Sequence, residues 1–159
     1  MAVNLPPPSS TLAAYPEKDQ SVLARYARAI AYYRIPQLDK ALPTIDGLIR
    51  DFPQDPYFRE LKGQMLFENG RVAEAQQPYE EAVRLAPAAP LLRISLAQTY
   101  VESNDPKLNK RAIAYLNLGD AYFELQRKPE AKDAYERFLD LAPNSKTAPA
   151  VREKLNSLP

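Results

Sequence analysis

Apolar residues recur every three or four positions along most of the chain, which is the spacing of amphipathic helices. They predict helices at about 20–34, 37–51, 56–69, 72–86, 90–103, 106–126, 129–141 and 147–157. Asp55 and Pro56 mark a capped helix start, as do Asp105 and Pro106, and Gly70 marks a helix end. No stretch alternates convincingly between apolar and polar residues, as a strand would. The pattern therefore predicts an all-α protein.

The same residue types return at fixed positions of a 34-residue unit. Small residues stand at positions 8 and 20, tyrosine at position 24 and proline at position 32. Counted from Pro56, these residues are Gly63, Ala75, Tyr79 and Pro87. Counted from Ala112, they are Gly119, Ala131, Tyr135 and Pro143. Because small residues let two helices approach closely, we expect each unit to form a helical hairpin that stacks on the next.

This spacing resembles that of tetratricopeptide (TPR) repeats over about residues 22–145. The resemblance implies an α-solenoid, with repeats that start at 22, 56, 90 and 112 within an array at 20–145. Residues 1–19 form a Pro-rich leader, which we expect to be extended or disordered. The leader is either a linker from an upstream domain or a segment that mimics a ligand in the groove. Residues 146–159 predict a capping helix, with Val151 and Leu155 facing inward.

The fourth repeat begins early. Starts at 22, 56 and 90 keep the 34-residue period, but the next start, at 112, follows after only 22 residues. Ala112 and Leu116 fit the packing positions of a second helix of repeat three, and the same segment opens repeat four. We therefore expect one fused helix at about 106–126, whose second half projects away from the first three hairpins.

Such a projection would expose apolar surface. We expect two chains to cover it mutually in a swapped or end-to-end homodimer, through Leu116, Leu118 and Tyr122 of the fused helix. The alternative is a kink near Asn117–Gly119, because glycine weakens a helix interior, and such a kink would restore a compact monomer.

Composition removes several kinds of chemistry. The chain has no cysteine and no histidine, so it cannot form a Ser-His or Cys-His dyad or a metal site ligated by either residue. We expect no catalytic residue, no cofactor and no metal. Its 21 basic and 20 acidic residues nearly cancel, which argues against nucleic acid as a partner. No apolar run approaches the roughly 20 residues of a membrane-spanning helix, so we expect no membrane insertion.

The resemblance to TPR arrays implies a concave face lined by positions 2, 5, 9, 12 and 13 of each first helix. Position 2 is Leu23, Tyr57, Leu91 and Ile113 in the four repeats. The candidate peptide-binding residues in this groove are Tyr26, Ile30, Tyr33, Tyr57, Glu60, Gln64, Phe67, Leu91, Ile94, Gln98, Asp120 and Phe123. They suit a peptide with apolar anchors. Positions 5 and 9 lack the basic and asparagine clamp that holds acidic chaperone C-termini. Alternatively, each aromatic residue only packs between hairpins.

A narrower resemblance covers residues 1–115. The segments 24–34, 56–71 and 90–98 are similar to the C-terminal repeats of bacterial periplasmic zinc metalloproteases related to the beta-barrel-assembly-enhancing protease. The resemblance implies a periplasmic location and repeats that engage substrates while a separate domain cuts. None of that family's metal or catalytic residues can be carried over, because the chain lacks histidine. Residues 112–158 resemble a generic TPR with a capping helix.

These observations favour a non-catalytic module that binds other polypeptides. Two alternatives stay open: the substrate-binding part of a larger metalloprotease, and a designed or recombined TPR scaffold with no natural ligand.

Overall fold

The computed structural model describes residues 6–103 and 108–158, and all its regular structure is helical. The helices are α1 (Pro8–Ala14), α2 (Val22–Arg34), α3 (Leu38–Asp51), α4 (Pro56–Glu68), α5 (Val72–Leu85), α6 (Pro90–Glu102), α7 (Leu108–Glu124), α8 (Lys128–Leu141) and α9 (Ala148–Asn156). The eight predicted helices are confirmed within a few residues. The all-α solenoid is therefore confirmed as the fold class.

Local signals explain several helix ends. The Ser21 side chain accepts a hydrogen bond from the Ala24 N–H at the start of α2, and Asp55 does the same for the Tyr57 N–H at the start of α4. Gly70, with φ +76°, lets the chain reverse between α4 and α5. Gln126 takes the same left-handed conformation, with φ +58°, between α7 and α8. The predicted start at Asp105 and Pro106 lies outside the described residues.

The prediction of an extended or disordered leader was wrong for residues 8–14, which form α1. Proline is tolerated in the first turn of a helix, so the Pro-rich run does not prevent helix formation at Pro8. A helix this short is unstable alone. The side chain of Leu12 packs against the core formed by α2, α3 and α4, and this tertiary contact stabilises it.

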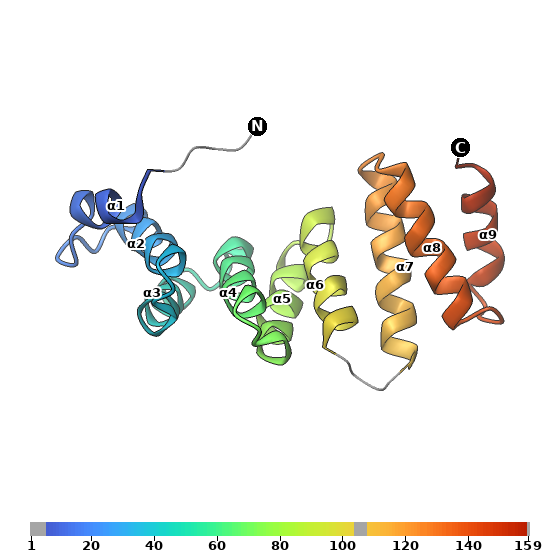
Figure 1. The fold of residues 1–159 in the computed structure, drawn as a ribbon, viewed down its shortest axis with the longest axis horizontal. Helices are drawn as coiled ribbons and strands as arrows, with labels where there is room; N and C mark the ends of the chain where they lie inside the picture. Colours follow the sequence, from blue (N-terminus) through green and yellow to red (C-terminus); the bar gives the residue numbers. More distant parts are fainter. Residues whose placement is uncertain (1–5, 104–107, 159) are drawn as a thin grey trace.

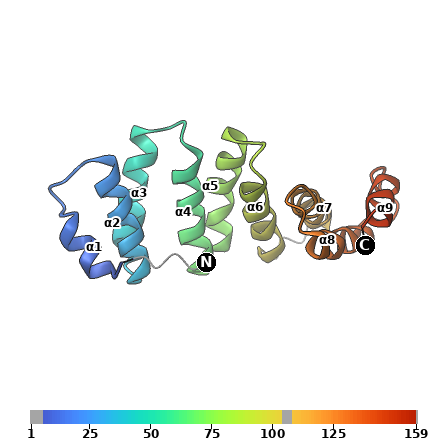
Figure 2. The ribbon, with the colours of Figure 1, turned by 90° about the horizontal axis from the view of Figure 1, so that it is seen from above.

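The helices form a curved row. Figure 1 shows α3 below α2 and α5 between α4 and α6, and the upper edge of the row is hollow between α2 and α7. In Figure 2, α2 to α6 lie lengthwise side by side, whereas α7 and α8 are seen almost end-on. The row therefore twists strongly where α6 meets α7.

Glycine at position 8 sets the spacing within two hairpins. A Cβ added to Gly63 would lie 2.9 Å from the ring of Tyr79, and one added to Gly119 would overlap the ring of Tyr135. The first repeat instead carries Ala29 opposite the smaller Ile45, and both are buried. The residue at position 8 is thus matched in size to the residue at position 24.

The long helix is present as α7, which runs without interruption through Asn117–Gly119. The alternative of a kink at that point was wrong. Ala121 and Leu118 keep the middle of α7 packed against α6 and α8, which offsets the low helix propensity of Gly119. Residues 106 and 107 lie outside the described residues, and the helix ends at Glu124, two residues before the predicted end.

The expectation that the second half of α7 projects away from the earlier hairpins was wrong. Arg93, near the start of α6, forms an ion pair with Glu124 at the end of α7. Lys110, near the start of α7, lies 5.5 Å above the ring of Tyr100 near the end of α6. The two helices are therefore antiparallel along their length.

The register of α7 also differs from the predicted one. Its residues Ala114, Leu118 and Ala121 form a cluster with α6, whereas Ala112 and Leu116 pack toward α8 and α9. One helix therefore serves two neighbours: it pairs with α6 on one side and forms the last hairpin with α8 on the other.

Candidate functional site

The most exposed large apolar side chains on α2, α4 and α6 share one position of the repeat. Leu23, Tyr57 and Leu91, all at position 2, are 64%, 59% and 61% exposed. Because α2, α4 and α6 follow one another in the same direction along the row (Figure 2), the three side chains lie at the same end of their helices. They are therefore exposed apolar side chains at corresponding places of three successive first helices.

Beside these three residues, aromatic side chains are partly buried between neighbouring hairpins. The rings of Tyr26 and Phe58 lie 5.9 Å apart, and Phe58 is itself buried. Burial raises the pKa of the Tyr26 hydroxyl. Ile30 and Tyr33 pack against the same core, and Phe67 packs against the cluster around Leu66 and Tyr79. Each of these aromatic residues therefore has a packing role as well as some exposed surface.

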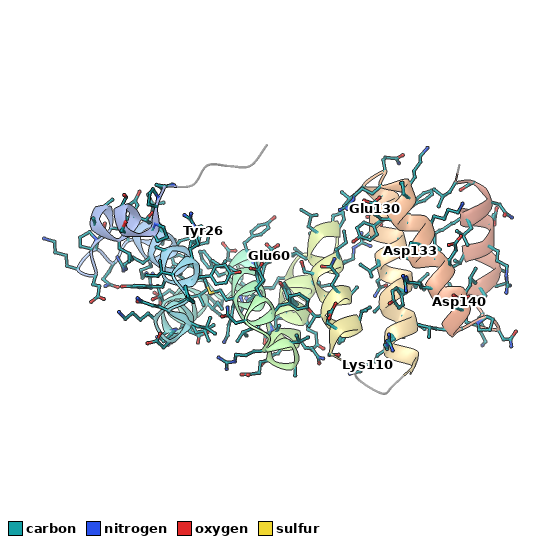
Figure 3. The ribbon with its side chains drawn as sticks, viewed as in Figure 1. Tyr26, Glu60, Lys110, Glu130, Asp133 and Asp140 are labelled. Atoms are coloured by element: carbon teal, nitrogen blue, oxygen red, sulfur yellow. The ribbon has the colours of Figure 1, made fainter. Side chains whose placement is uncertain are left out.

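Two glutamates, Glu60 and Glu68, occupy positions 5 and 13 of α4. The Tyr33 hydroxyl donates a hydrogen bond to Glu68, and Gln64 Nε2 donates another to the same carboxylate at 2.8 Å, so Glu68 joins α2 to α4. Burial raises the pKa of the Glu60 carboxyl. No cation pairs with Glu60 among residues 6–103 and 108–158. Tyr26 and Glu60 both face the hollow side of the row (Figure 3).

The N-terminal segment lies against one end of this surface. Arg34 Nη1 donates a hydrogen bond to the carbonyl of Pro6 at 2.7 Å. A small cleft of about 200 Å³ is lined by residues from both sides: Pro6, Thr11, Tyr15, Tyr26, Ala27, Ile30, Ala31 and Arg34. Positions 5, 9 and 13 of α2 are therefore partly covered by the chain itself.

The candidate residues on α6 and α7 divide between different surroundings. Leu91 and Gln98 are exposed, whereas Ile94 is buried against α7. Asp120 accepts hydrogen bonds from the Tyr135 hydroxyl at 2.8 Å and from Lys154 at 2.6 Å, and Phe123 packs toward α8 and α9. Because α7 runs opposite to α6, its positions do not continue the face formed by α2, α4 and α6.

The residues considered for self-association are also separated. Leu118 is buried between α6, α7 and α8, and Leu116 packs toward α8 and α9. Tyr122 is half-buried, with the guanidinium of Arg127 4.7 Å from its ring. Of the three, Leu118 and Tyr122 line a surface groove between α7 and α8, and Leu116 does not.

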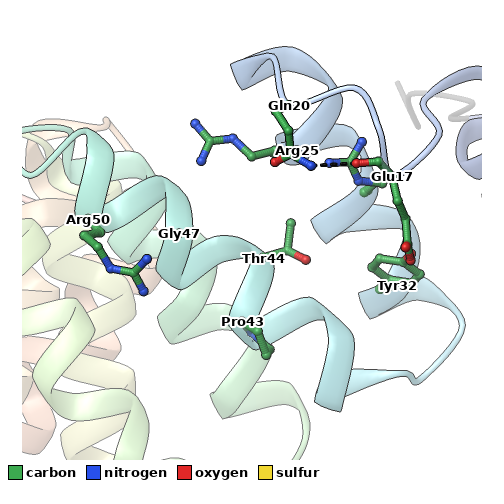
Figure 4. Close-up of a pocket in the computed structure, with 9 residues that line it drawn as sticks. Glu17, Gln20, Arg25, Tyr32, Pro43, Thr44, Gly47 and Arg50 are labelled. Atoms are coloured by element: carbon green, nitrogen blue, oxygen red, sulfur yellow. Dashed lines mark hydrogen bonds between the residues drawn. The ribbon is translucent and has the colours of Figure 1, made fainter.

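A polar cleft of about 420 Å³ between α2 and α3 was not predicted (Figure 4). Arg28 is buried there and donates hydrogen bonds to the carbonyls of Pro16 and Asp19, at 2.8 and 2.7 Å. Arg25 pairs with Asp51 at 2.5 Å. The signal was present in the sequence, since position 7 is Arg28 in the first repeat and leucine in the last two. Through these hydrogen bonds, Arg28 holds the segment before α2 against the first hairpin.

Two general observations concern other kinds of site. Within residues 6–103 and 108–158, no cluster of three or more acidic, histidine or cysteine side chains is arranged to hold a metal ion. No helix in the same ranges is long and apolar enough to cross a membrane.

Comparison with known proteins agrees with the repeat pattern. Two family models, both described as tetratricopeptide repeat, match residues 26–90 and residues 112–145. The human RNA polymerase II-associated protein 3 is 31% identical over 134 residues, an alignment that covers 72% of this chain and 20% of that protein. The chain thus spans about one fifth of the length of this relative. The helical hairpins, the residue spacing and the two matches together place the chain in the tetratricopeptide-repeat family.

Proposed function

We propose that this chain is a non-catalytic module that binds a segment of another polypeptide along the concave side of α2, α4 and α6. The observation that carries the proposal is the row formed by Leu23, Tyr57 and Leu91, each more than half exposed. Exposed apolar side chains in a contiguous row are typical of peptide-binding surfaces, where they act as anchors. TPR proteins in general bind other polypeptides, which agrees with this reading.

The charges on this side indicate the chemistry of the ligand. Glu60 lacks a cationic partner in the described part of the chain, and Glu68 lies two turns further along α4. A lysine or arginine of a bound peptide would neutralise Glu60, while apolar side chains would contact Tyr57 and Leu91. The ligand we propose is therefore an apolar segment that carries a basic residue, rather than an acidic C-terminus.

Selection of peptides from a random 12-residue phage-displayed library, followed by affinity measurement with variants, tests this proposal. Tyr57→Ser and Leu91→Ser should each weaken the selected peptides about tenfold, as the loss of a contact anchor does. Ile113→Ser is the matched control. Ile113 also occupies position 2 and is 56% exposed, but it lies near the start of α7, at the end of α6 opposite Leu91.

Two results would contradict the proposal. One is equal binding by wild type and by Tyr57→Ser and Leu91→Ser, and the other is a loss of binding caused by Ile113→Ser alone. Selected peptides that are rich in acidic residues would contradict the proposed ligand chemistry while leaving the location intact.

Two finer statements stay predictions. A homodimer through α7 predicts a dimeric mass in light scattering at high concentration, and a strictly monomeric mass would contradict it. The resemblance to metalloprotease repeats predicts that an immobilised chain retains outer-membrane assembly proteins from a bacterial envelope extract, whereas a scaffold without a natural ligand would retain nothing specific. The name of the human relative describes association with RNA polymerase II, which applies to that protein.

A further inference from the structure

In the earlier repeats, the second helix of one hairpin packs on a groove of the next hairpin. Leu42 of α3 packs on the cluster that contains Leu66 of α4, and Asp46 of α3 accepts a hydrogen bond from Lys62 at 2.7 Å. Lys62 and Leu66 occupy positions 7 and 11 of their repeat. The helix α3 therefore covers positions 7 and 11 of α4.

The next pair of hairpins repeats this arrangement. Leu96 of α6, at position 7, packs against the cluster that contains Tyr79 of α5. The hydroxyl of Tyr100, at position 11, donates a hydrogen bond to Glu80 of α5. In both cases, the preceding second helix therefore packs against positions 7 and 11 of the first helix.

The last hairpin has the same positions without such a helix. Leu118 and Tyr122 of α7 are positions 7 and 11, and they have the same residue types as Leu96 and Tyr100 of α6. They line a groove of about 390 Å³ whose lining residues all belong to α7 and α8: Tyr115, Leu118, Tyr122, Pro129, Glu130, Asp133 and Ala134. The helix α6 contacts the adjoining side of α7 through Ala114, Leu118 and Ala121, so Leu118 is buried, whereas Tyr115 and Tyr122 are half-buried.

Charged side chains flank the tyrosines of this groove. Arg127 and Arg137 lie 4.7 and 5.9 Å from the ring centres of Tyr122 and Tyr115. Each arginine also pairs with an acid of α8, Glu130 at 2.7 Å and Asp133 at 2.9 Å. Figure 3 shows these two acids along α8. The groove is therefore apolar along α7, and its α8 side carries two acids, each paired with an arginine that lies over a tyrosine ring. A carboxylate of a partner could share these guanidinium groups.

We propose that this groove binds an amphipathic α-helix of a partner polypeptide, in the place that α5 occupies on α6. The partner helix would present an apolar side chain to Tyr115 and to the part of Leu118 that α6 leaves uncovered. One turn along, it would present a carboxylate to the hydroxyl of Tyr122 or to Arg127, as Glu80 is presented to Tyr100. This groove includes positions 4, 7 and 11 of α7, so it is separate from the concave surface, which is formed by positions 2 and 5 of the earlier first helices.

A second copy of this chain does not supply a suitable helix from its described residues. The helices α3 and α5 already pack on the hairpins that follow them. The helix α1 has only seven residues. The exposed side of α9 carries Arg152, Glu153 and Asn156, which are polar. We therefore expect a helix of another protein, rather than a second copy of this chain, to bind in the groove.

The test uses a probe taken from the chain itself. A fluorescein-labelled peptide of residues 72–85, cross-linked through positions 73 and 77 to hold it helical, copies the helix that covers Leu96 and Tyr100. Its binding to the full chain is measured by fluorescence anisotropy. We expect saturable binding that weakens about tenfold in Tyr122→Ser. A probe with Glu80→Lys should also bind more weakly, because it reverses the charge near Arg127.

Ile113→Ser is the matched control, since it removes an exposed apolar side chain of α7 that does not line the groove, and it should leave probe binding unchanged. Circular dichroism melts confirm that the variants are folded. The proposal is overturned by the absence of saturable binding, by equal binding to wild type and Tyr122→Ser, or by loss of binding in Ile113→Ser. A chain that sediments as a dimer, and becomes monomeric in Tyr122→Ser, would show that a second copy occupies the groove instead.

Discussion

At the scale of single residues, Glu60 is a partly buried carboxyl that faces the concave side (Figure 3). Burial raises the pKa of its carboxyl above the ordinary glutamate value of 4.5. No cation offsets this cost in the described part of the chain. An acid kept at such a position, partly desolvated and facing a surface groove, is a candidate for contact with a ligand.

This raised pKa predicts a pH-dependent effect on stability. The folded chain holds the Glu60 proton more tightly than the unfolded chain, so the stability contribution of this group falls as the pH rises through its folded pKa. Glu60→Gln should therefore raise the melting temperature at about pH 7 and change it little at about pH 4. Thermal unfolding at both pH values measures this difference.

Glu136→Gln is the control, because it makes the same change on an exposed side of α8. If Glu60→Gln lowers the melting temperature at neutral pH while the control does not, the carboxylate has a favourable interaction in the folded chain and the explanation is wrong.

At the scale of helices, the distance between the two helices of a hairpin depends on the pair at positions 8 and 24. Gly63 faces Tyr79 and Gly119 faces Tyr135, whereas Ala29 and Ile45 occupy these positions in the first repeat. The larger ring requires the smaller partner, because the interior is close-packed. Burial also raises the pKa of Tyr79 to about 12.

Gly63→Ala should destabilise the chain by about 1–3 kcal/mol, since its Cβ would meet the Tyr79 ring at 2.9 Å. The double variant Gly63→Ala with Tyr79→Ile copies the first repeat and should recover part of that loss relative to the two single changes added together. Urea unfolding of the four proteins in this cycle measures the coupling. Strict additivity would mean that the two residues do not limit the helix spacing.

At the scale of the whole molecule, each hairpin depends on its neighbours, and α7 is shared between two of them. Its Leu118 contributes to the cluster with α6, and its Gly119 contacts Tyr135 of α8. At the far end, Val151 of α9 is buried in the same cluster as Tyr135 and Phe138, and Lys154 pairs with Asp120 of α7. The last helix therefore covers the final hairpin, as terminal elements of repeat arrays do.

A chain that ends at Asn144 should lose this cover. The apolar side of α8, including Phe138, would become exposed, so we expect a lower melting temperature and self-association. Thermal melts and light scattering of the shortened chain, compared with Val151→Ala in the full chain, measure both effects. An unchanged melting temperature and a monomeric mass would show that α9 is dispensable.

The sequence alone was sufficient for the helices, the repeat spacing and the small residues at Gly63 and Gly119, because these depend on periodicity and on contacts within one hairpin. It also indicated the long helix, since neither proline nor a turn interrupts 108–124. The direction of that helix was not predictable. Whether α7 continues the row or turns back along α6 depends on contacts such as Arg93 with Glu124, which join residues distant in sequence.

The tertiary structure likewise determined which neighbours several of the candidate residues contact. Asp120 and Phe123 occupy groove positions by count, yet Asp120 pairs with Lys154 of α9 and Phe123 packs toward α8 and α9. Residues 8–14 read as an extended leader, yet the contact of Leu12 with the core holds them as a helix. Local periodicity determines which residues share a face of one helix, and only the packing of whole helices decides what that face meets.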